Sequence, residues 1–202
     1  MDNQMQIWEK RYSAKEFAYG KEPNEFFARS IVGKNPGRLL VPAAGEGRDA
    51  VHAAKLGWQV TAFDTIEAGM NKCNLLAEES GVRIDYRLCD ALDFEPEPEG
   101  YDMIVLTYFH LPSTLRKTIY PRFADWLKPG GMILLEAFSK KQLGNASGGP
   151  KDPDWLFSLE DLKTDLDVLQ FQTAEETQTV LSEGIYHQGA AEVVRLKANK
   201  PG

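Results

Sequence analysis

The sequence has little of what marks a secreted, metal-binding or membrane protein. It contains only two cysteines, Cys73 and Cys89, which form no CxxC or Cys/His ligand pattern, and its three histidines stand apart. This predicts two free thiols and no structural zinc site. No apolar run approaches the ~20 residues that span a bilayer, and the polar first ten residues lack the apolar core of a secretory signal. We therefore expect a cytoplasmic protein that does not bind membranes.

Basic residues are also few, with 23 Lys and Arg against 30 Asp and Glu and a net charge of −7. Binding to phosphate backbones needs clustered basic side chains, so we expect no nucleic-acid partner. The 202 residues suffice for one well-filled α/β domain and are short for two. The chain is therefore predicted to be a single domain over residues 1–202, present as a monomer or a homodimer.

Apolar runs and helical faces alternate along most of the chain. Strands are expected at residues 38–42, 59–64, 84–89, 101–107 and 132–138, and helices at 25–31, 46–56, 67–80 and 115–127. This alternation predicts a parallel sheet with helices on both faces. A Gly/Pro-rich loop, a capping box at residues 158–161 and two final strands, 168–181 and 191–198, then predict an antiparallel ending.

The first 32 residues are rich in aromatic side chains outside any strand pattern, among them Trp8, Tyr12 and Tyr19. They predict an N-terminal arm docked on the core, or a lid whose rings cover a bound ligand, and the two interpretations are compatible. Asn24 is expected to cap the helix that starts at residue 25.

Residues 39–49 combine a buried strand, a turn of small residues and a helix. A helix N-terminus presents unpaired N–H groups to one spot, and Gly45 and Gly47 would let a ligand approach the backbone closely. By itself the pattern is equally typical of a tight packing turn.

Polar or aromatic residues follow three further strands. Asp64 ends the second strand and Asp90 the third, where their carboxylates could bind ribose hydroxyls and an adenine amine, and Tyr108 follows the fourth. Ligands of open parallel sheets bind at the carboxyl ends of the strands, so these residues predict an adenosyl-ligand site. Each acid alone could instead cap the next helix.

The acids of the turn distinguish two adenosyl cofactors. A dinucleotide-binding oxidoreductase usually has a third glycine, which Ala50 replaces here in a way that the looser pattern admits. Glu46 and Asp49 would repel a pyrophosphate and suit a sulfonium and an ammonium. The turn therefore favours S-adenosylmethionine over NAD.

Motifs along the chain resemble those of class I S-adenosylmethionine-dependent methyltransferases, and within them the group related to tellurite-resistance and thiopurine methyltransferases. They lie at residues 19–24, 44–50, 63–64, 89–91, 127–131, 148–151 and 183–189. The resemblance implies a Rossmann-like class I fold whose seven-stranded, mostly parallel sheet has its last strand antiparallel. It further implies that residues 1–32 form an arm or lid over the cofactor site. The implied reaction is methyl transfer by direct displacement, with S-adenosylhomocysteine as product. The acceptor would be a small molecule, such as a thiol or a tellurite- or selenite-type oxyanion.

The resemblance also implies a set of cofactor-binding residues: Tyr19, Ala43, Ala44, Gly45, Gly47, Arg48, Asp64, Ile66, Asp90, Ala91, Leu92 and Thr107. Among these, Asp64 would bind the ribose, Asp90 with Ala91 the adenine, and residues 43–47 the methionine part. The sequence departs from the pattern at Val41, where an acid that helps to hold the amino group is usual, and at Ala43, where a glycine is usual. Glu46, Arg48 or Tyr19 could compensate.

The acceptor side has fewer signals. His110 is the candidate base or orienting group, with Tyr108 beside it; the alternative for His110 is a capping or core-facing role. His187 is expected to pack in the hairpin, and Lys140, Lys141 and Lys151 could attract an anionic acceptor or simply be solvated. Two rival functions remain open, a non-catalytic adenosyl-ligand-binding protein of the same fold and an NAD-dependent oxidoreductase.

Overall fold

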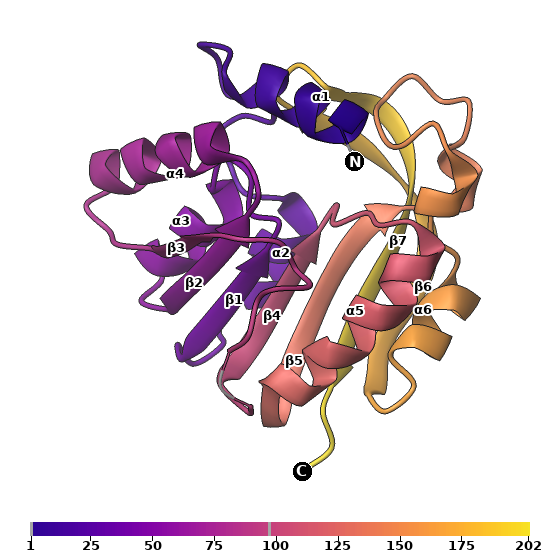
Figure 1. The fold of residues 1–202 in the computed structure, drawn as a ribbon. Coiled ribbons are helices and arrows are strands. Elements are labelled where there is room, and N and C mark those ends of the chain that lie inside the picture. The colour runs from indigo at the N-terminus through magenta and orange to yellow at the C-terminus, as the bar shows by residue number, and fades with distance from the viewer. Residues whose placement is uncertain (1, 97) are drawn as a thin grey trace. The chain divides into compact units, whose positions relative to one another are not determined.

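The computed structural model describes residues 2–96 and 98–202 (Figure 1). The chain divides into two compact units. The first comprises residues 1–94 together with Glu183–Tyr186, and the second comprises Glu95–Ser182 and His187–Gly202. The expectation of one domain over residues 1–202 stays a prediction.

The first unit is built around three parallel strands. Its elements are α1 (Asp2–Tyr12), α2 (Glu25–Ile31), β1 (Arg38–Pro42), α3 (Arg48–Lys55), β2 (Gln59–Asp64), α4 (Glu67–Glu79) and β3 (Asp85–Leu88). Strand β2 lies between β1 and β3 and pairs in parallel with both. The apolar runs of β1 and β2 are almost completely buried, as expected for strands covered on both faces.

The second unit carries the remaining four strands. Its elements are β4 (Tyr101–Thr107), α5 (Ser113–Trp126), β5 (Leu127–Phe138), the 3₁₀ turns η1 (Lys140–Gln142) and η2 (Pro153–Trp155), α6 (Leu159–Asp165), β6 (Gln170–Glu183) and β7 (His187–Asn199). Strand β5 pairs in parallel with β4 and antiparallel with β7. Its central residues are fully buried and form the core of this unit.

The seven strands follow the order β3-β2-β1-β4-β5-β7-β6, with helices around the sheet. The last strand in the sequence is antiparallel to its neighbour β5, so the predicted class I fold is confirmed. Two predicted helix starts are confirmed as well. The Asn24 side chain accepts a hydrogen bond from the Phe27 N–H, and Ser158 and Asp161 form a capping box at the start of α6.

Several boundaries differ from the prediction; β6 and β7, for example, cover Gln170–Glu183 and His187–Asn199 rather than 168–181 and 191–198. The arm begins with a helix, α1, that its aromatic spacing did not indicate. Helix α3 starts two residues late because Gly47 adopts a left-handed conformation with φ of 84°. Strand β5 starts five residues early because Leu127 already pairs with Tyr101 of β4, and Gly130 and Gly131 exchange backbone hydrogen bonds with Lys200, far away in the sequence.

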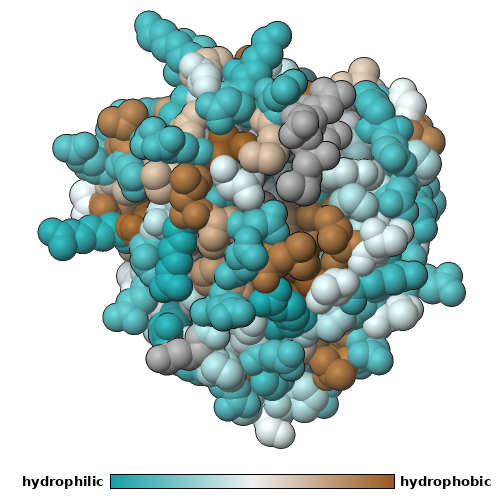
Figure 2. Space-filling model, in the orientation of Figure 1, coloured by the Kyte–Doolittle hydropathy of each residue, from teal (hydrophilic) through white to brown (hydrophobic). Residues whose placement is uncertain are grey.

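Among the described residues, no helix is both long and apolar enough to cross a membrane. Figure 2 shows mostly hydrophilic residues on the visible face, with hydrophobic groups in patches between them. The net charge of −7 agrees with this polar surface.

Candidate functional site

The turn after β1 has an unusual backbone. Ala43, Gly45 and Gly47 all have positive φ, at 49°, 53° and 84°. The Gly47 N–H donates to the Ala44 carbonyl, and the Ala44 N–H donates to the Phe63 carbonyl at the end of β2. A left-handed conformation costs a residue with a Cβ about 1–2 kcal/mol, so Ala43 is strained at the position where a glycine is usual.

Asp64, at the end of β2, is bound directly to this turn. Its Oδ2 accepts a hydrogen bond from the Gly45 N–H at 2.9 Å, and its Oδ1 accepts from the N–H groups of Thr65 and Ile66 at 2.7 and 3.1 Å. Burial raises the pKa of the Asp64 carboxyl, and these three hydrogen bonds oppose that rise. Since each carboxylate oxygen can accept two hydrogen bonds, Oδ2 keeps capacity for a ligand hydroxyl.

An added Cβ at each of the two glycines of the turn would collide with a different neighbour. A Cβ on Gly45 would lie 2.6 Å from the Tyr12 hydroxyl oxygen, and the Gly45 carbonyl accepts a hydrogen bond from Tyr86 at 2.8 Å. A Cβ on Gly47 would lie 2.6 Å from the Cβ of Cys73 on α4. The bare face of Gly47 is therefore needed for packing against α4, and the expectation that the turn admits a ligand stays a prediction.

The acids of the turn bind the N-terminal arm. Glu46 is only 5% exposed; its Oε2 accepts from the Ala18 N–H at 2.8 Å, and its Oε1 pairs with Lys72 at 2.7 Å. Asp49 accepts from the Asn24 N–H at 2.7 Å. These carboxylates hold the arm, and the expectation that they suit a cationic cofactor stays a prediction.

The arm itself is docked, as predicted. Tyr12 is 8% exposed and packs with Ala18 and Ile66, which buries the predicted cofactor residue Ile66. The Tyr19 hydroxyl accepts from Arg11 at 2.7 Å, and the Tyr19 carbonyl accepts from Arg48 at 3.2 Å. Both Tyr19 and Arg48 therefore already have partners within the first unit.

Asp90 follows β3 and is exposed. Its Oδ1 accepts from the Leu92 N–H at 2.8 Å, and its carbonyl accepts from the next two N–H groups along the chain, those of Asp93 and Phe94. Ala91 beside it is buried, whereas the Leu92 side chain is 44% exposed. Asp90 thus caps a turn, whereas the alternative left open by the sequence was a cap of the next helix, and its exposed carboxylate can also accept from a ligand.

The other predicted residues lie in the second unit. Thr107 ends β4, and Tyr108 follows it with φ of 53°. The Tyr108 hydroxyl donates to Glu136 Oε1 at 3.0 Å, while Oε2 of that carboxylate pairs with Arg195 at 2.5 Å. The Tyr108 ring also meets the His187 ring edge-on at 4.6 Å, so His187 packs in the hairpin as predicted.

His110 has both ring nitrogens engaged by backbone groups. Nδ1 lies 2.8 Å from the Trp155 carbonyl, and Nε2 accepts the Phe138 N–H at 3.2 Å. A carbonyl only accepts, so Nδ1 carries the proton and the ring is neutral. Burial lowers the pKa of His110 to about 4, opposed by the bond to Trp155 and assisted by the charge of His187. In this conformation His110 has no lone pair with which to take a proton from an acceptor.

Two of the three lysines proposed to attract an anion are neutralised at the surface. Lys140 pairs with Asp161 at 2.6 Å, and Lys141 pairs with Glu176 at 2.7 Å. The exposed Lys151 lies 3.5 Å from the Asn145 carbonyl.

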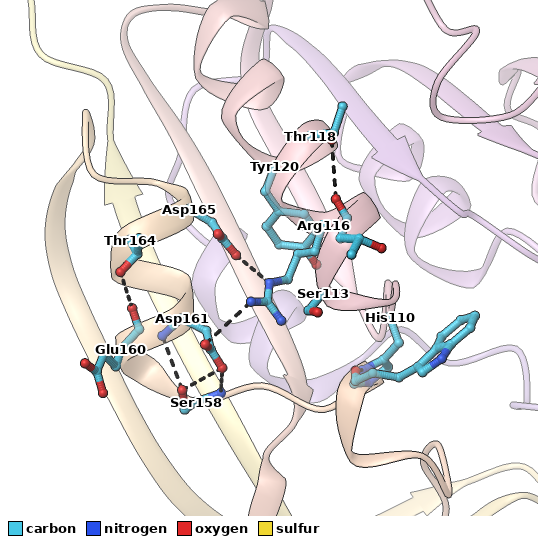
Figure 3. Close-up of polar contacts among 12 residues, drawn as sticks. His110, Ser113, Arg116, Thr118, Tyr120, Ser158, Glu160, Asp161, Thr164 and Asp165 are labelled. Atoms are coloured by element: carbon cyan, nitrogen blue, oxygen red, sulfur yellow. Dashed lines mark hydrogen bonds and ion pairs between the residues drawn. The ribbon is translucent and has the colours of Figure 1, made fainter.

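A buried ion cluster was not predicted. Arg116 on α5 is 2% exposed and points between Asp161 and Asp165 of α6 (Figure 3). Its guanidinium also lies 5.4 Å from the centre of the Phe157 ring. The only sequence signal was the spacing of the two aspartates, which puts them on one face of a helix. The cluster joins α5 to α6 within the second unit.

The comparisons with known proteins agree with this architecture. Residues 40–131 match a family model described as "Methyltransferase domain". Over these residues the chain is therefore similar to methyltransferase domains. The match runs from β1 to the start of β5 and includes the glycine turn, Asp64 and Asp90. The match supports the predicted resemblance to class I methyltransferases, and the narrower resemblance to the tellurite-resistance and thiopurine group stays a prediction.

Similar proteins are known by sequence and by structure. A ubiquinone biosynthesis O-methyltransferase of Xanthomonas euvesicatoria is 32% identical over 106 residues, which cover 51% of this chain and 44% of that protein. The match thus spans less than half of the relative's length. TehB from Haemophilus influenzae has a TM-score of 0.73 at 19% identity, covering 98% of this chain and 67% of TehB.

A further structural neighbour contains bound ligands. The 1,6-didemethyltoxoflavin-N1-methyltransferase of Burkholderia thailandensis, solved with 1,6-didemethyltoxoflavin and S-adenosylhomocysteine, has a TM-score of 0.64 at 17% identity. The similarity covers all of this chain and 80% of the neighbour. At such identities the two structural neighbours establish the fold.

Proposed function

We propose that this chain transfers the methyl group of S-adenosylmethionine to a small-molecule acceptor. The observation that carries the proposal is the bond between Asp64 and the Gly45 N–H, which joins a carboxylate at the end of β2 to the glycine turn after β1. A carboxylate there can accept from ribose hydroxyls beside a turn that binds the rest of the cofactor. The family match over residues 40–131 supports the same function.

The residues present fit this cofactor. Asp64 would bind the ribose, Asp90 and Ala91 the adenine, and residues 43–47 the methionine part. When bound, S-adenosylmethionine supplies an activated methyl group on a sulfonium. The chain must hold the acceptor in line with that group and exclude water, and such positioning can contribute roughly 7–11 kcal/mol.

The methionine end needs a new candidate, because the acid usual at position 41 is a buried valine. Glu46, Arg48 and Tyr19, the candidates from the sequence, already bind other residues. Tyr12 lies against Gly45, and among the described residues no hydrogen bond engages its hydroxyl. Burial, aided by the charge of Asp64, raises the pKa of Tyr12 well above its ordinary value. The hydroxyl stays protonated and can bind either an ammonium or a carboxylate.

The acceptor is proposed to be a thiol or an oxyanion of the tellurite or selenite type. A hydroxyl acceptor needs a base to take its proton, and His110 has both nitrogens engaged. A thiolate or an oxyanion needs none. His110 would then position the backbone of Trp155 and Phe138. Free Cys73 and Cys89 support a reducing, cytoplasmic location.

Calorimetric titration with S-adenosylhomocysteine and with NAD tests the cofactor. We expect S-adenosylhomocysteine alone to bind, and Asp64→Ala to weaken it at least about tenfold, or about 1.4 kcal/mol. Asp85→Ala is the matched control, since Asp85 is an exposed carboxylate on the neighbouring strand β3 that pairs with the exposed Arg87. Unchanged affinity in Asp64→Ala would contradict the ribose assignment, and binding of NAD instead would favour an oxidoreductase.

An acceptor screen with labelled S-adenosylmethionine tests the reaction. The panel should contain thiols, tellurite, selenite and phenols, the last because the relative in Xanthomonas is an O-methyltransferase. Labelled thioethers or methylated oxyanions are expected. Transfer to phenols alone would contradict a reaction without a base, and binding without transfer to any class would favour a non-catalytic ligand-binding protein.

A further inference from the structure

The tip of the β6–β7 hairpin packs with the N-terminal unit. Residues Glu183–Tyr186 belong by their contacts to the first unit, whereas the rest of both strands belongs to the second. This tip opens the 183–189 motif, and neither the proposed cofactor site nor the acceptor site uses it. Its contacts join it to the arm and to the start of α3.

The Glu183 carboxylate joins two segments of the first unit. Its Oε2 pairs with Arg48 at 3.0 Å, and its Oε1 accepts from the Asn24 side-chain amide at 3.3 Å. The Arg48 and Glu183 side chains are only 10% and 12% exposed. A charge-assisted pair with so little solvent is stronger than an exposed ion pair.

The next two residues contact the arm through the backbone. The Ile185 N–H donates to the Ala18 carbonyl at 3.1 Å. Gly184, with φ of 60°, lies so close that a Cβ would be 2.6 Å from the Tyr19 Cα and 2.7 Å from the Ala18 carbonyl carbon. No side chain fits at position 184 while the tip is docked.

The same arm segment is held from its other side by the glycine turn. Ala18 donates its N–H to Glu46, and Asn24 donates its N–H to Asp49. The arm residues 18–24 thus lie between the acids that follow β1 and the hairpin tip.

We propose that the hairpin tip Glu183–Tyr186 is a latch that keeps arm residues 18–24 closed on the glycine turn, and that Glu183 and Gly184 are positioning residues for cofactor binding. The cofactor part of this inference rests on the proposed function. Glu183 acts through Arg48 and Asn24, and Gly184 acts by leaving room for the arm. Opening the arm for exchange of cofactor and product then requires the tip to undock.

A steric test uses two glycines of the same hairpin. In Gly184→Ala the new Cβ collides with the arm backbone, whereas at Gly189, with φ of 97°, an added Cβ would have no atom within 4 Å. Gly189→Ala therefore carries the backbone strain without the collision. Hydrogen exchange of the unliganded protein should be at least about tenfold faster at residues 18–24 in Gly184→Ala than in Gly189→Ala. Exchange in β5 should be equal in the two variants.

An electrostatic test removes the charge without changing the shape. Glu183→Gln is compared with Glu176→Gln. Glu176 lies on the same strand as Glu183, away from the arm, and the substitution breaks its ion pair with Lys141. In Glu183→Gln we expect S-adenosylhomocysteine to bind about tenfold more weakly and to dissociate faster. The KM for S-adenosylmethionine should rise while kcat does not fall. Glu176→Gln should match the wild type.

The outcomes separate this inference from the proposed function. Equal exchange at residues 18–24 in Gly184→Ala and Gly189→Ala would overturn the latch, whether or not the cofactor binds. Faster exchange with unchanged affinity for S-adenosylhomocysteine would overturn the positioning role. If wild-type protein binds no S-adenosylhomocysteine, the proposed function fails, and the exchange experiment still decides whether the latch exists. Thermal unfolding of all four variants identifies any that do not fold.

Discussion

The two units use their buried charges differently. In the first, the carboxylates of Glu46 and Asp49 bind backbone N–H groups of the arm, in addition to the side-chain pairs Glu46–Lys72 and Glu183–Arg48. In the second, buried carboxylates bind arginine side chains, as in the pairs Asp165–Arg116 and Glu136–Arg195. The first arrangement holds a segment that has no regular structure, and the second joins helices and strands that are already formed.

This difference indicates which contacts serve stability and which serve binding. A backbone N–H bound to a carboxylate can exchange that partner for water when the arm moves away. A buried arginine that loses its carboxylate leaves an uncompensated charge in the interior, which costs far more. We therefore expect the ions of the second unit to govern unfolding and those of the first to govern access to the turn.

The largest expected effect is on the buried pair of α5 and α6. Arg116→Met leaves Asp165 without its main partner and should lower the free energy of unfolding by about 3–5 kcal/mol, measured by urea denaturation. The matched control is Arg29→Met, which breaks an exposed pair with Glu25 and should cost at most about 1 kcal/mol. Affinity of the folded Arg116→Met protein for S-adenosylhomocysteine should not change. A loss of affinity in Arg116→Met would contradict the expectation that the ions of the second unit govern unfolding and not ligand binding.

Gly47→Ala tests the packing of the glycine turn against α4. The collision with Cys73 and the left-handed φ together should cost about 3 kcal/mol of unfolding free energy. Gly81→Ala has a similar φ of 66° with no atom near its Cβ, and should cost only about 1 kcal/mol. Equal losses in the two variants would mean that Cys73 yields and that the turn is not tightly packed.

His110 should make the second unit sensitive to acid. Its pKa is about 4 in the folded chain and ordinarily about 6.5, so the unfolded chain binds the proton more readily. The contribution of His110 to the free energy of unfolding is then fully present above pH ~6.5, and it falls by up to about 3 kcal/mol as the pH drops to about 4. Denaturation of wild type and His110→Gln at pH 7 and pH 4 measures this. The acid-induced loss should be smaller in the variant, and an equal loss would contradict the role of His110.

The smallest expected effect is on the strained backbone of the turn at Ala43. Ala43 has φ of 49°, which glycine adopts without cost. Ala43→Gly should therefore stabilise the protein by about 1 kcal/mol, seen as a rise in Tm of a few degrees. A fall in Tm would show that the Ala43 methyl group contributes packing that outweighs the strain.

The sequence predicted the features that depend on neighbouring residues. Asn24 and Ser158 signal helix starts because their side chains bind N–H groups three residues ahead. Asp64 was predictable because strand ends in a parallel sheet lie together. The same local patterns predicted the mostly parallel sheet and its antiparallel ending, whereas the strand order was not predicted.

The partners of Glu46 and Asp49 could not be predicted in the same way. Every residue except proline carries a backbone N–H, so nothing in the sequence marks those of residues 18 and 24 as the donors. The early start of β5 likewise depends on distant residues, Tyr101 opposite Leu127, and Lys200, which is 70 residues beyond Gly130. For His110, the residue type suggested catalysis, and only the positions of Trp155 and Phe138 reveal that its nitrogens are engaged.

Asn24 has a chemical requirement that follows from its two partners. Its side-chain oxygen accepts the Phe27 N–H, and its side-chain nitrogen donates to Glu183. An aspartate would keep the helix cap but place a second negative charge against Glu183, and a serine is too short to reach both partners. Only a short carboxamide offers an acceptor and a donor at opposite corners, so one small planar group connects a helix start to a loop more than 150 residues away.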